Sequence, residues 1–288
     1  MDIIIIGLLL GGTYALIAMG LNLQYGVARI MNLANGEMLV AGGFTAFWFY
    51  TAGQINPVAA LIVVAPVAFA VNWLIYRFML QPLVLRAKSR GQLEVDSILA
   101  TFGMSFAFVG VMTWAFGGGY FNYAFLAQPV ELFGSSYARN RVVAFVLAVL
   151  IGGALWLWLT QSRAGLRLRA VSVNPRSSSL VGVDVRATSA LAFALGGAVT
   201  ATGGALVSMF FTLDASVGVL FTMKALIIVI MGGVGDIRGT IVAAVILGIT
   251  ETAVARLIDP GLTLAAAYLL FLLVLLFRPA GLFGKATG

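Results

Sequence analysis

The strongest constraint on this chain is a succession of apolar segments, each close to the length that crosses a lipid bilayer. A spanning helix needs about 20 mostly apolar residues. Nine segments approach or meet that length: 3–24, 36–53, 57–80, 96–116, 141–160, 188–211, 219–233, 239–257 and 262–278. Because lipid offers exposed backbone no hydrogen-bond partner, such segments cross as helices. We therefore predict an all-α polytopic membrane protein with eight or nine spans. The count depends on whether the short segment 219–233 crosses fully or re-enters.

The residue types present exclude several kinds of chemistry. Charged residues make up 9% of the chain and hydrophobic residues 61%, whereas soluble domains are roughly 25% charged. The chain has no Cys and no His, which excludes disulfides, thiol chemistry and His-based catalysis or metal binding. It also has no Gly-x4-Gly-Lys-Ser/Thr loop for ATP. We expect no enzyme activity, no catalytic residue, no metal and no cofactor.

The basic residues lie in short links between the apolar segments. This distribution is typical of the signals that orient membrane proteins, and it does not indicate nucleic-acid binding. We place the links after the third and fifth segments on the cytoplasmic side. Only four of the 17 Lys and Arg residues then lie elsewhere, namely Arg139, Arg141, Lys224 and Arg256. This orientation puts the N-terminus outside and the C-terminus inside. The N-terminal apolar segment begins with Asp2 and lacks a basic flank, so we interpret it as a retained span.

Three polar residues, Asn32, Asn35 and Glu37, stand at the start of the second apolar segment. A polar or charged side chain inside a membrane faces the bundle interior or a water path, because lipid does not solvate it. These residues are candidates for a translocation path. An equally good interpretation is that an Asn caps the helix and Glu37 favours its first turn.

A glycine-rich stretch interrupts the apolar sequence between residues 219 and 257. Gly232, Gly233 and Gly235 permit a sharp turn, and non-helical backbone at membrane depth must be covered by protein or line a cavity. We therefore predict a broken or re-entrant segment and add these glycines to the candidate path. Lys224 and Glu251 are isolated charges on either side of it. They either pair with each other, which we favour, or line the path.

Small residues in the sixth segment share one helix face. Gly196, Thr200, Gly203 and Gly204 recur at spacings of three, four and seven residues, which lets helix backbones approach closely in lipid. We interpret this face as a packing surface, with a sliding contact as the alternative.

The link over about 162–187 contains five arginines and the signals of a short helix. Asn174 suits an N-cap and Pro175 the first helical position. Gly182 suits the left-handed stop after the last turn. We therefore predict a helix over Pro175–Val181 outside the hydrocarbon. A loop that only orients the protein needs arginines but no capped helix, so we interpret this one as a docking element. Its predicted contacts are Leu180 and Val181, with Arg176 at the rim.

Four stretches resemble the permease subunits of branched-chain amino acid ABC importers, and specifically the smaller of the two permeases. They are residues 11–43, 163–206, 223–251 and 275–285, the last reading LLFRPAGLFGK. They resemble the N-terminal signature, the coupling segment with its next helix, the glycine-rich break and the C-terminus of that family. The similarity extends along nearly the whole chain.

The resemblance implies a single permease domain over residues 1–288 in a bacterial inner membrane, with a periplasmic N-terminus. Its partners would be a second permease subunit, commonly a longer relative, two cytoplasmic ATP-binding subunits and a periplasmic solute-binding protein. The predicted short helix would dock in a groove of an ATPase. The implied solutes are branched-chain or related amino acids, or alternatively urea, amides or aromatic and other organic acids.

A stand-alone channel or secondary transporter is the alternative from another class. Such carriers often bind solute through broken helices in both halves of the chain. The sequence shows one glycine-rich break, in the second half only, and this favours the importer.

Overall fold

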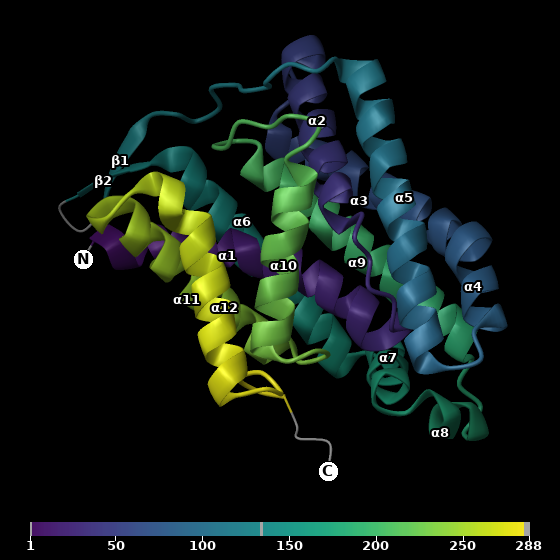
Figure 1. The fold of residues 1–288 in the computed structure, drawn as a ribbon. Helices are drawn as coiled ribbons and strands as arrows, with labels where there is room; N and C mark the ends of the chain where they lie inside the picture. Colours follow the sequence, from purple (N-terminus) through teal and green to yellow (C-terminus); the bar gives the residue numbers. More distant parts are fainter. Residues whose placement is uncertain (1, 133–134, 285–288) are drawn as a thin grey trace.

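The computed structural model describes residues 2–132 and 135–284, and it is built mainly of helices (Figure 1). Each of the nine predicted segments forms a helix. Their bounds are α1 (Asp2–Leu23), α2 (Asn35–Gly53), α3 (Pro57–Ile75), α5 (Arg90–Phe116), α6 (Arg139–Gln161), α9 (Val185–Val207), α10 (Gly218–Gly232), α11 (Ile237–Leu257) and α12 (Thr263–Phe277). Within the described residues, seven helical stretches are long and apolar enough by themselves to cross a membrane. The all-α membrane fold predicted from the sequence is confirmed.

Two spans run further than the apolar pattern predicts. Helix α1 continues into a π-helical turn, η1 (Gln24–Ala28), and α3 continues through η2 (Tyr76–Leu80) into α4 (Gln81–Arg86). Pro82 does not break this run because it lies at the start of α4, where a missing N–H is tolerated. The continuous apolar sequence ends before the helical run does, so the end of the third span predicted from hydropathy, residue 80, is too early.

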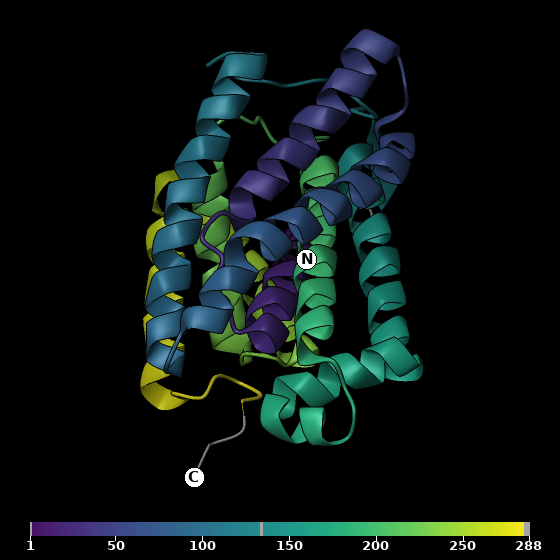
Figure 2. The ribbon, with the colours of Figure 1, turned by 90° about the vertical axis from the view of Figure 1, so that its right-hand side faces the viewer.

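Helix α9 lies at the centre of the bundle. It packs against α1, α2 and α3, and α1 in turn packs along α11. Helices α3, α5, α6 and α12 lie at the periphery (Figures 1 and 2). They expose large apolar side chains such as Trp114 on α5 and Leu272 on α12. Because these outward faces are apolar, they suit contact with lipid or with a neighbouring membrane helix, where polar groups would not be solvated.

Glycines let α9 and its neighbours come into backbone contact. A β-carbon on Gly204 would overlap the backbone of Leu39 in α2, and one on Gly196 would overlap the backbone of Gly20 in α1. In lipid there is no hydrophobic driving force between helices, so close backbone packing of this kind stabilises their association. The small-residue face of the sixth segment is therefore a packing surface.

The two ends of the bundle differ in structure. The basic end carries α4, the link helices α7 (Arg163–Val173) and α8 (Pro175–Leu180), and the turn between α10 and α11 (Figures 1 and 2). The opposite end, called the hairpin end below, carries β1 (Pro129–Leu132) paired antiparallel with β2 (Ser135–Ala138). Asp2 accepts hydrogen bonds there from Ser135 at 2.8 Å and Tyr137 at 3.1 Å. The start of α1 is thereby tied to the hairpin.

The aromatic segment 117–128 crosses the hairpin end. Phe121 forms an antiparallel bridge with Leu213, and the hydroxyl of Tyr123 lies 2.9 Å from that of Ser208. Burial raises the pKa of Tyr123 to about 12, so the phenol stays protonated at neutral pH. Tyr120 by contrast is exposed. The segment is anchored at two points and presents its remaining surface outward.

We predict that Gly204→Ala destabilises the protein whereas Gly110→Ala does not. The added methyl at position 204 must displace the α2 backbone, and such overpacking costs about 1–3 kcal/mol. Gly110 lies on α5, where an added β-carbon would have nothing within 4 Å, so alanine there stabilises the helix by up to about 1 kcal/mol. Thermal unfolding in detergent measures both. Equal midpoints for the two variants would contradict the close α2–α9 contact.

Candidate functional site

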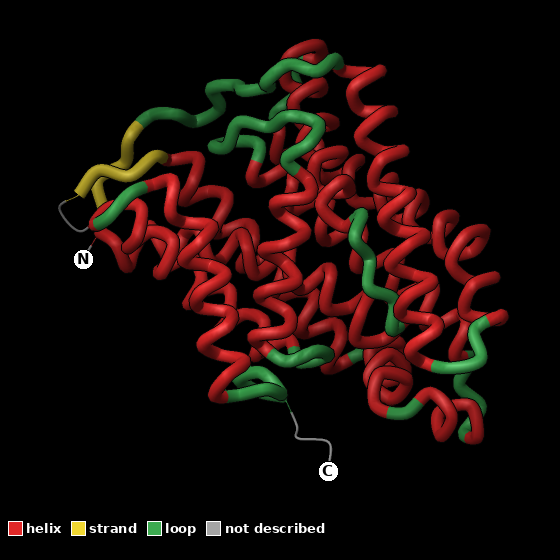
Figure 3. The backbone as a smooth tube through the Cα atoms, viewed as in Figure 1, coloured by secondary structure: helices red, strands yellow, loops and turns green. Residues whose placement is uncertain are grey.

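The chain between η1 and α2 is not helical, although it lies inside the bundle. Arg29 ends η1 in the left-handed region, with φ of 57°, and segment 29–34 then runs between the helices to the start of α2 (Figure 3). Ile30, Asn32 and Ala34 are fully buried. Irregular backbone at this depth requires protein partners, because neither lipid nor bulk water reaches it.

Two threonines from other helices supply those partners. The hydroxyl of Thr101 on α5 accepts a hydrogen bond from the backbone N–H of Leu33 at 3.1 Å. The hydroxyl of Thr222 on α10 accepts one from the N–H of Gly36 at 2.8 Å and lies 3.2 Å from the carbonyl of Leu33. The start of α2 is therefore capped by a residue 186 positions away in the sequence, and α2 has no side-chain cap of its own.

Asn32, Asn35 and Glu37 are all buried here, each at most 1% exposed. Asn32 donates to Gln24 at 2.9 Å and accepts from the N–H of Ala34 at 3.0 Å. Asn35 accepts from Thr200 at 3.0 Å. Neither Asn therefore acts as the N-cap of α2, which was one interpretation of the sequence.

Glu37 lies in the first turn of α2 and accepts a hydrogen bond from Ser105 on α5 at 3.0 Å. Its second carboxylate oxygen and the side-chain nitrogen of Asn35 have no hydrogen-bond partner among the described residues. Unpaired buried polar atoms are costly in a fold that only has to be stable. Their presence keeps these residues candidates for the path.

The predicted glycine-rich turn joins α10 to α11. Gly233 and Gly235 adopt φ of 107° and 85°, which side chains with a β-carbon rarely adopt. Gly232 packs directly against Gly239 across the turn. Asp236 caps α11 by accepting from the N–H of Gly239 at 2.9 Å.

The two groups of path candidates contact opposite parts of η1 and are not brought into one cluster. Gln24 of η1 bonds to Asn32, whereas Gly26 of η1 packs against Gly235 of the turn. Segment 29–34 is also a second irregular stretch, and it lies in the first half of the chain. It joins two predicted apolar segments and contains no glycine, so it does not contradict the prediction of a single glycine-rich break.

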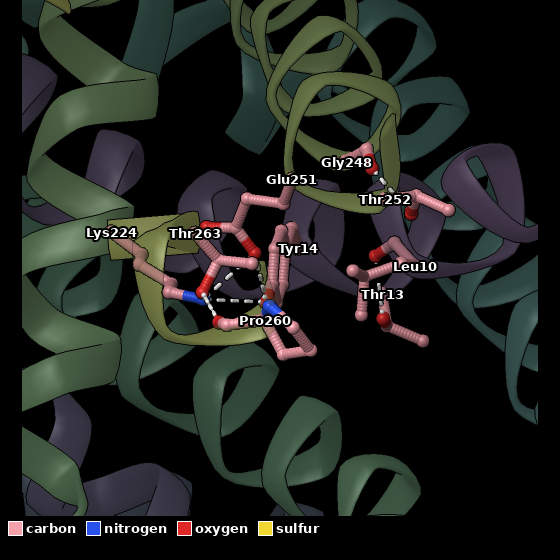
Figure 4. A network of polar contacts seen from close by, with 9 residues as sticks. All are labelled: Leu10, Thr13, Tyr14, Lys224, Gly248, Glu251, Thr252, Pro260 and Thr263. Atoms are coloured by element: carbon pink, nitrogen blue, oxygen red, sulfur yellow. Dashed lines mark hydrogen bonds and ion pairs between the residues drawn. The ribbon is translucent and has the colours of Figure 1, made fainter. Parts of the chain in front are cut away.

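A buried ionic cluster joins α1, α10 and α11 (Figure 4). The ammonium of Lys224 lies 2.8 Å from Glu251 and donates a second hydrogen bond to the hydroxyl of Tyr14 at 2.8 Å. Tyr14 donates to the same carboxylate oxygen of Glu251 at 2.9 Å. The two charges pair, which is the interpretation we favoured from the sequence. The cluster also borders a cavity, so pairing and lining a cavity are compatible.

The link over 162–187 contains the predicted short helix. Asn174 caps α8 by accepting from the N–H groups of Arg176 and Ser177, each at 3.1 Å, and Pro175 is its first residue. Gly182 adopts φ of 81° after the last turn. Leu180 and Val181 are 88% and 77% exposed, so two adjacent apolar side chains are open to a partner.

The helix that precedes α8 was not predicted from the sequence. Helix α7 (Arg163–Val173) lies between α6 and α8, and Ser162 caps it by accepting from the N–H of Gly165. Ser162, placed directly after an apolar span, is the N-cap signal that was available for this start. Arg29, which directly follows η1, donates to the carbonyl of Ser172 at 3.3 Å, and this contact connects the link to the core.

Thr101, Ser105 and Thr222 were also missed as site residues. Ser97, Thr101 and Ser105 recur at every fourth position of α5, which puts them on one helix face. A polar stripe in an apolar helix is the signal that was available for them. Thr222 and Tyr14 give no such signal, because their partners lie about 190 and 240 residues away in sequence.

The membrane-length helices, with irregular backbone buried among them, define the class of this chain as a polytopic membrane protein. Over residues 3–278 the sequence matches the family described as "Branched-chain amino acid transport system / permease component". The chain belongs to this family. It is therefore a membrane permease component that works with other components of a transport system.

Curated relatives agree with this assignment. The permease protein LivH of the high-affinity branched-chain amino acid transport system of Escherichia coli K12 is 27% identical, over 97% of this chain and 94% of its own length. BraD of Pseudomonas aeruginosa gives the same identity and coverage. LsrD, the autoinducer 2 import permease of Escherichia coli, is 28% identical over 37% of this chain and 34% of its own length.

We predict that Thr222→Val destabilises the protein by about 1–3 kcal/mol, because it leaves the buried N–H of Gly36 without an acceptor. Thr250→Val is the matched control. The hydroxyl of Thr250 only donates to the carbonyl of Ile246 one turn earlier in its own helix, at 2.9 Å. Thermal unfolding of the two variants in detergent measures the difference, and equal losses would show that Thr222 does not hold segment 29–34.

Proposed function

We propose that this chain is the transmembrane permease subunit of an ATP-driven importer for branched-chain or related amino acids. The observation that carries the proposal is the family match along nearly the whole chain, combined with an exposed capped helix at the basic end. In this proposal the full chain forms one permease domain. It pairs with a second permease subunit, a longer relative, and takes its solute from a periplasmic binding protein.

Helix α8 is the proposed contact with one of the two cytoplasmic ATP-binding subunits. Leu180 and Val181 offer an apolar surface with no partner in the described part of the chain, and Arg176 supplies a charge at its rim. A capped helix with a fixed glycine stop transmits a push better than a flexible loop, because its end groups are already hydrogen-bonded. Helix α7 and Arg29 connect it to the core.

The proposed path runs past Asn32, Asn35 and Glu37, with the Gly232, Gly233 and Gly235 turn at its cytoplasmic end. Movement of α8 and α7 reaches η1 through Arg29, and η1 contacts both the Asn32 segment and the glycine turn. ATP binding shifts the protein between states only through its different affinity for them. The contacts of η1 are where the two states would differ.

The same kind of permease for another solute is the second candidate. The partial match to the autoinducer 2 import permease favours it, because that relative is named for a solute that is not an amino acid. Urea, amides and aromatic or other organic acids belong to this candidate. The assembly and the coupling helix are the same in both.

We predict that Leu180→Asp or Val181→Asp uncouples ATP hydrolysis from transport, because a carboxylate in the apolar contact weakens ATPase docking. Leu180→Met, which keeps the apolar surface, is the matched control. The measurement is ATP-driven leucine uptake and ATPase activity of the complete importer in proteoliposomes. Uptake should fall at least several-fold in the Asp variants while all subunits still copurify.

Two outcomes would contradict this proposal. Coupled uptake by both Asp variants equal to that of Leu180→Met would remove α8 from the coupling role. Solute uptake by this chain alone, without ATP and without its partners, would identify a stand-alone carrier in place of an importer subunit.

The proposed orientation has its own test. The chain contains no Cys, so a single introduced thiol reports its side of the membrane. Ser177→Cys in exposed α8 should react with an impermeant maleimide only after the inner membrane is opened, whereas Thr51→Cys at the end of α2 should react in intact spheroplasts. The reverse pattern would invert the topology.

A further inference from the structure

A cavity of about 350 Å³ lies near the hairpin end, between α1, α10, α11 and the start of α12. Apolar side chains form most of its wall, including Leu9 and Leu10 of α1 and Phe210 and Phe211 of the segment after α9. Lys224, Tyr14 and Glu251, the cluster drawn in Figure 4, also line it. Its size and apolar lining are those of a small-molecule site.

In this cluster, Lys224 can donate a further hydrogen bond and Glu251 can accept one. Lys224 has three N–H donors and donates one to Glu251 and one to Tyr14. Glu251 accepts both of its hydrogen bonds on one oxygen. Its other oxygen, Oε1, has no partner among the described residues, although the residue is 3% exposed. An unsatisfied buried carboxylate oxygen favours a ligand that brings a donor.

The mouth of the cavity is cationic. Arg141, at the start of α6, and Arg256, near the end of α11, both line it and are exposed. The guanidinium of Arg141 lies 5.7 Å from the ring centre of Phe210, which holds it over the apolar wall. Three cations and one carboxylate therefore surround the cavity, an arrangement that attracts a carboxylate from the hairpin side.

We propose that this cavity binds the zwitterion of an aliphatic α-amino acid as it enters the permease, an inference that rests on the proposed function. The solute carboxylate lies between Arg141 and Lys224. Its ammonium donates to Glu251 after a side-chain rotation that turns Oε1 toward the cavity. The aliphatic side chain packs against Leu9, Leu10 and Phe210. Each group of the solute thus contacts cavity residues of complementary charge or polarity.

A purely structural ion pair is the competing explanation. In that case Lys224 and Glu251 only hold α10 against α11 and α1, and no solute enters. The two explanations differ in one observable, which is whether a solute with both charges shields a cavity residue from a reagent in solution.

The test uses the full-length chain in nanodiscs with Ala255→Cys, a cavity-lining position, as its only thiol. The modification rate with a small methanethiosulfonate is measured alone and with L-leucine, 4-methylpentanoate or urea. Leucine should slow modification several-fold, 4-methylpentanoate less, since it lacks the ammonium, and urea not at all. Thr51→Cys, exposed on α2 away from the cavity lining, should be modified at the same rate throughout.

The double substitution Lys224→Met with Glu251→Gln, added to Ala255→Cys, separates the two roles because it removes both charges together and leaves no unpaired buried charge. Protection by leucine should disappear while the thermal midpoint shows that the protein is folded. Arg141→Gln, at an exposed position, should weaken protection without affecting folding. Should the double variant fail to fold, Arg141→Gln alone carries the test.

Absence of protection by leucine in the otherwise unaltered chain would overturn this inference, as would equal protection by 4-methylpentanoate. Its failure is distinguishable from failure of the proposed function. If the complete importer takes up leucine but leucine does not protect Ala255→Cys, only the cavity assignment is wrong. If the complete importer takes up no amino acid, the proposed solute class is wrong.

Discussion

Every backbone polar group inside the membrane needs a partner within the protein, and the rest of this structure depends on that requirement. Within helices the partners lie one turn away. In segment 29–34 they do not, and Thr101 and Thr222 reach in from α5 and α10 to supply them. Asn22 of α1 does the same for the glycine turn, bonding to the N–H of Gly235 and the carbonyl of Asp236. Both irregular stretches are thereby bound to helices that are remote in sequence.

Close packing through glycine lets those distant helices stay in register. Gly204 and Gly196 bring α9 against α2 and α1, so side chains as short as Thr200 and Asn35 can meet across the contact at 3.0 Å. The same closeness leaves little room for solvent. The buried charge of Lys224 is accordingly balanced by an opposite charge beside it, that of Glu251.

The functional features divide between the two ends of the bundle. The capped α8, with its exposed apolar pair, lies at the basic end, and the charged cavity lies toward the hairpin end. Helix α1 connects them: it contributes Tyr14 to the ionic cluster, and η1 follows it to meet α7 through Arg29. In the proposed function these separate features act together, since movement at one end has to change access at the other.

The sequence by itself determined that the nine apolar segments are helices, which family the chain resembles, and where α8 starts and stops. These depend on local signals: apolar runs, an Asn-Pro start and a Gly stop act through neighbours in the chain. The tertiary structure alone decided that the link over 29–34 is buried among the helices, that Thr222 rather than an Asn caps α2, and that Tyr14 completes the ionic pair. Those outcomes depend on contacts between residues some 70 to 240 positions apart. A local pattern carries no record of such contacts, because they arise only when the helices pack.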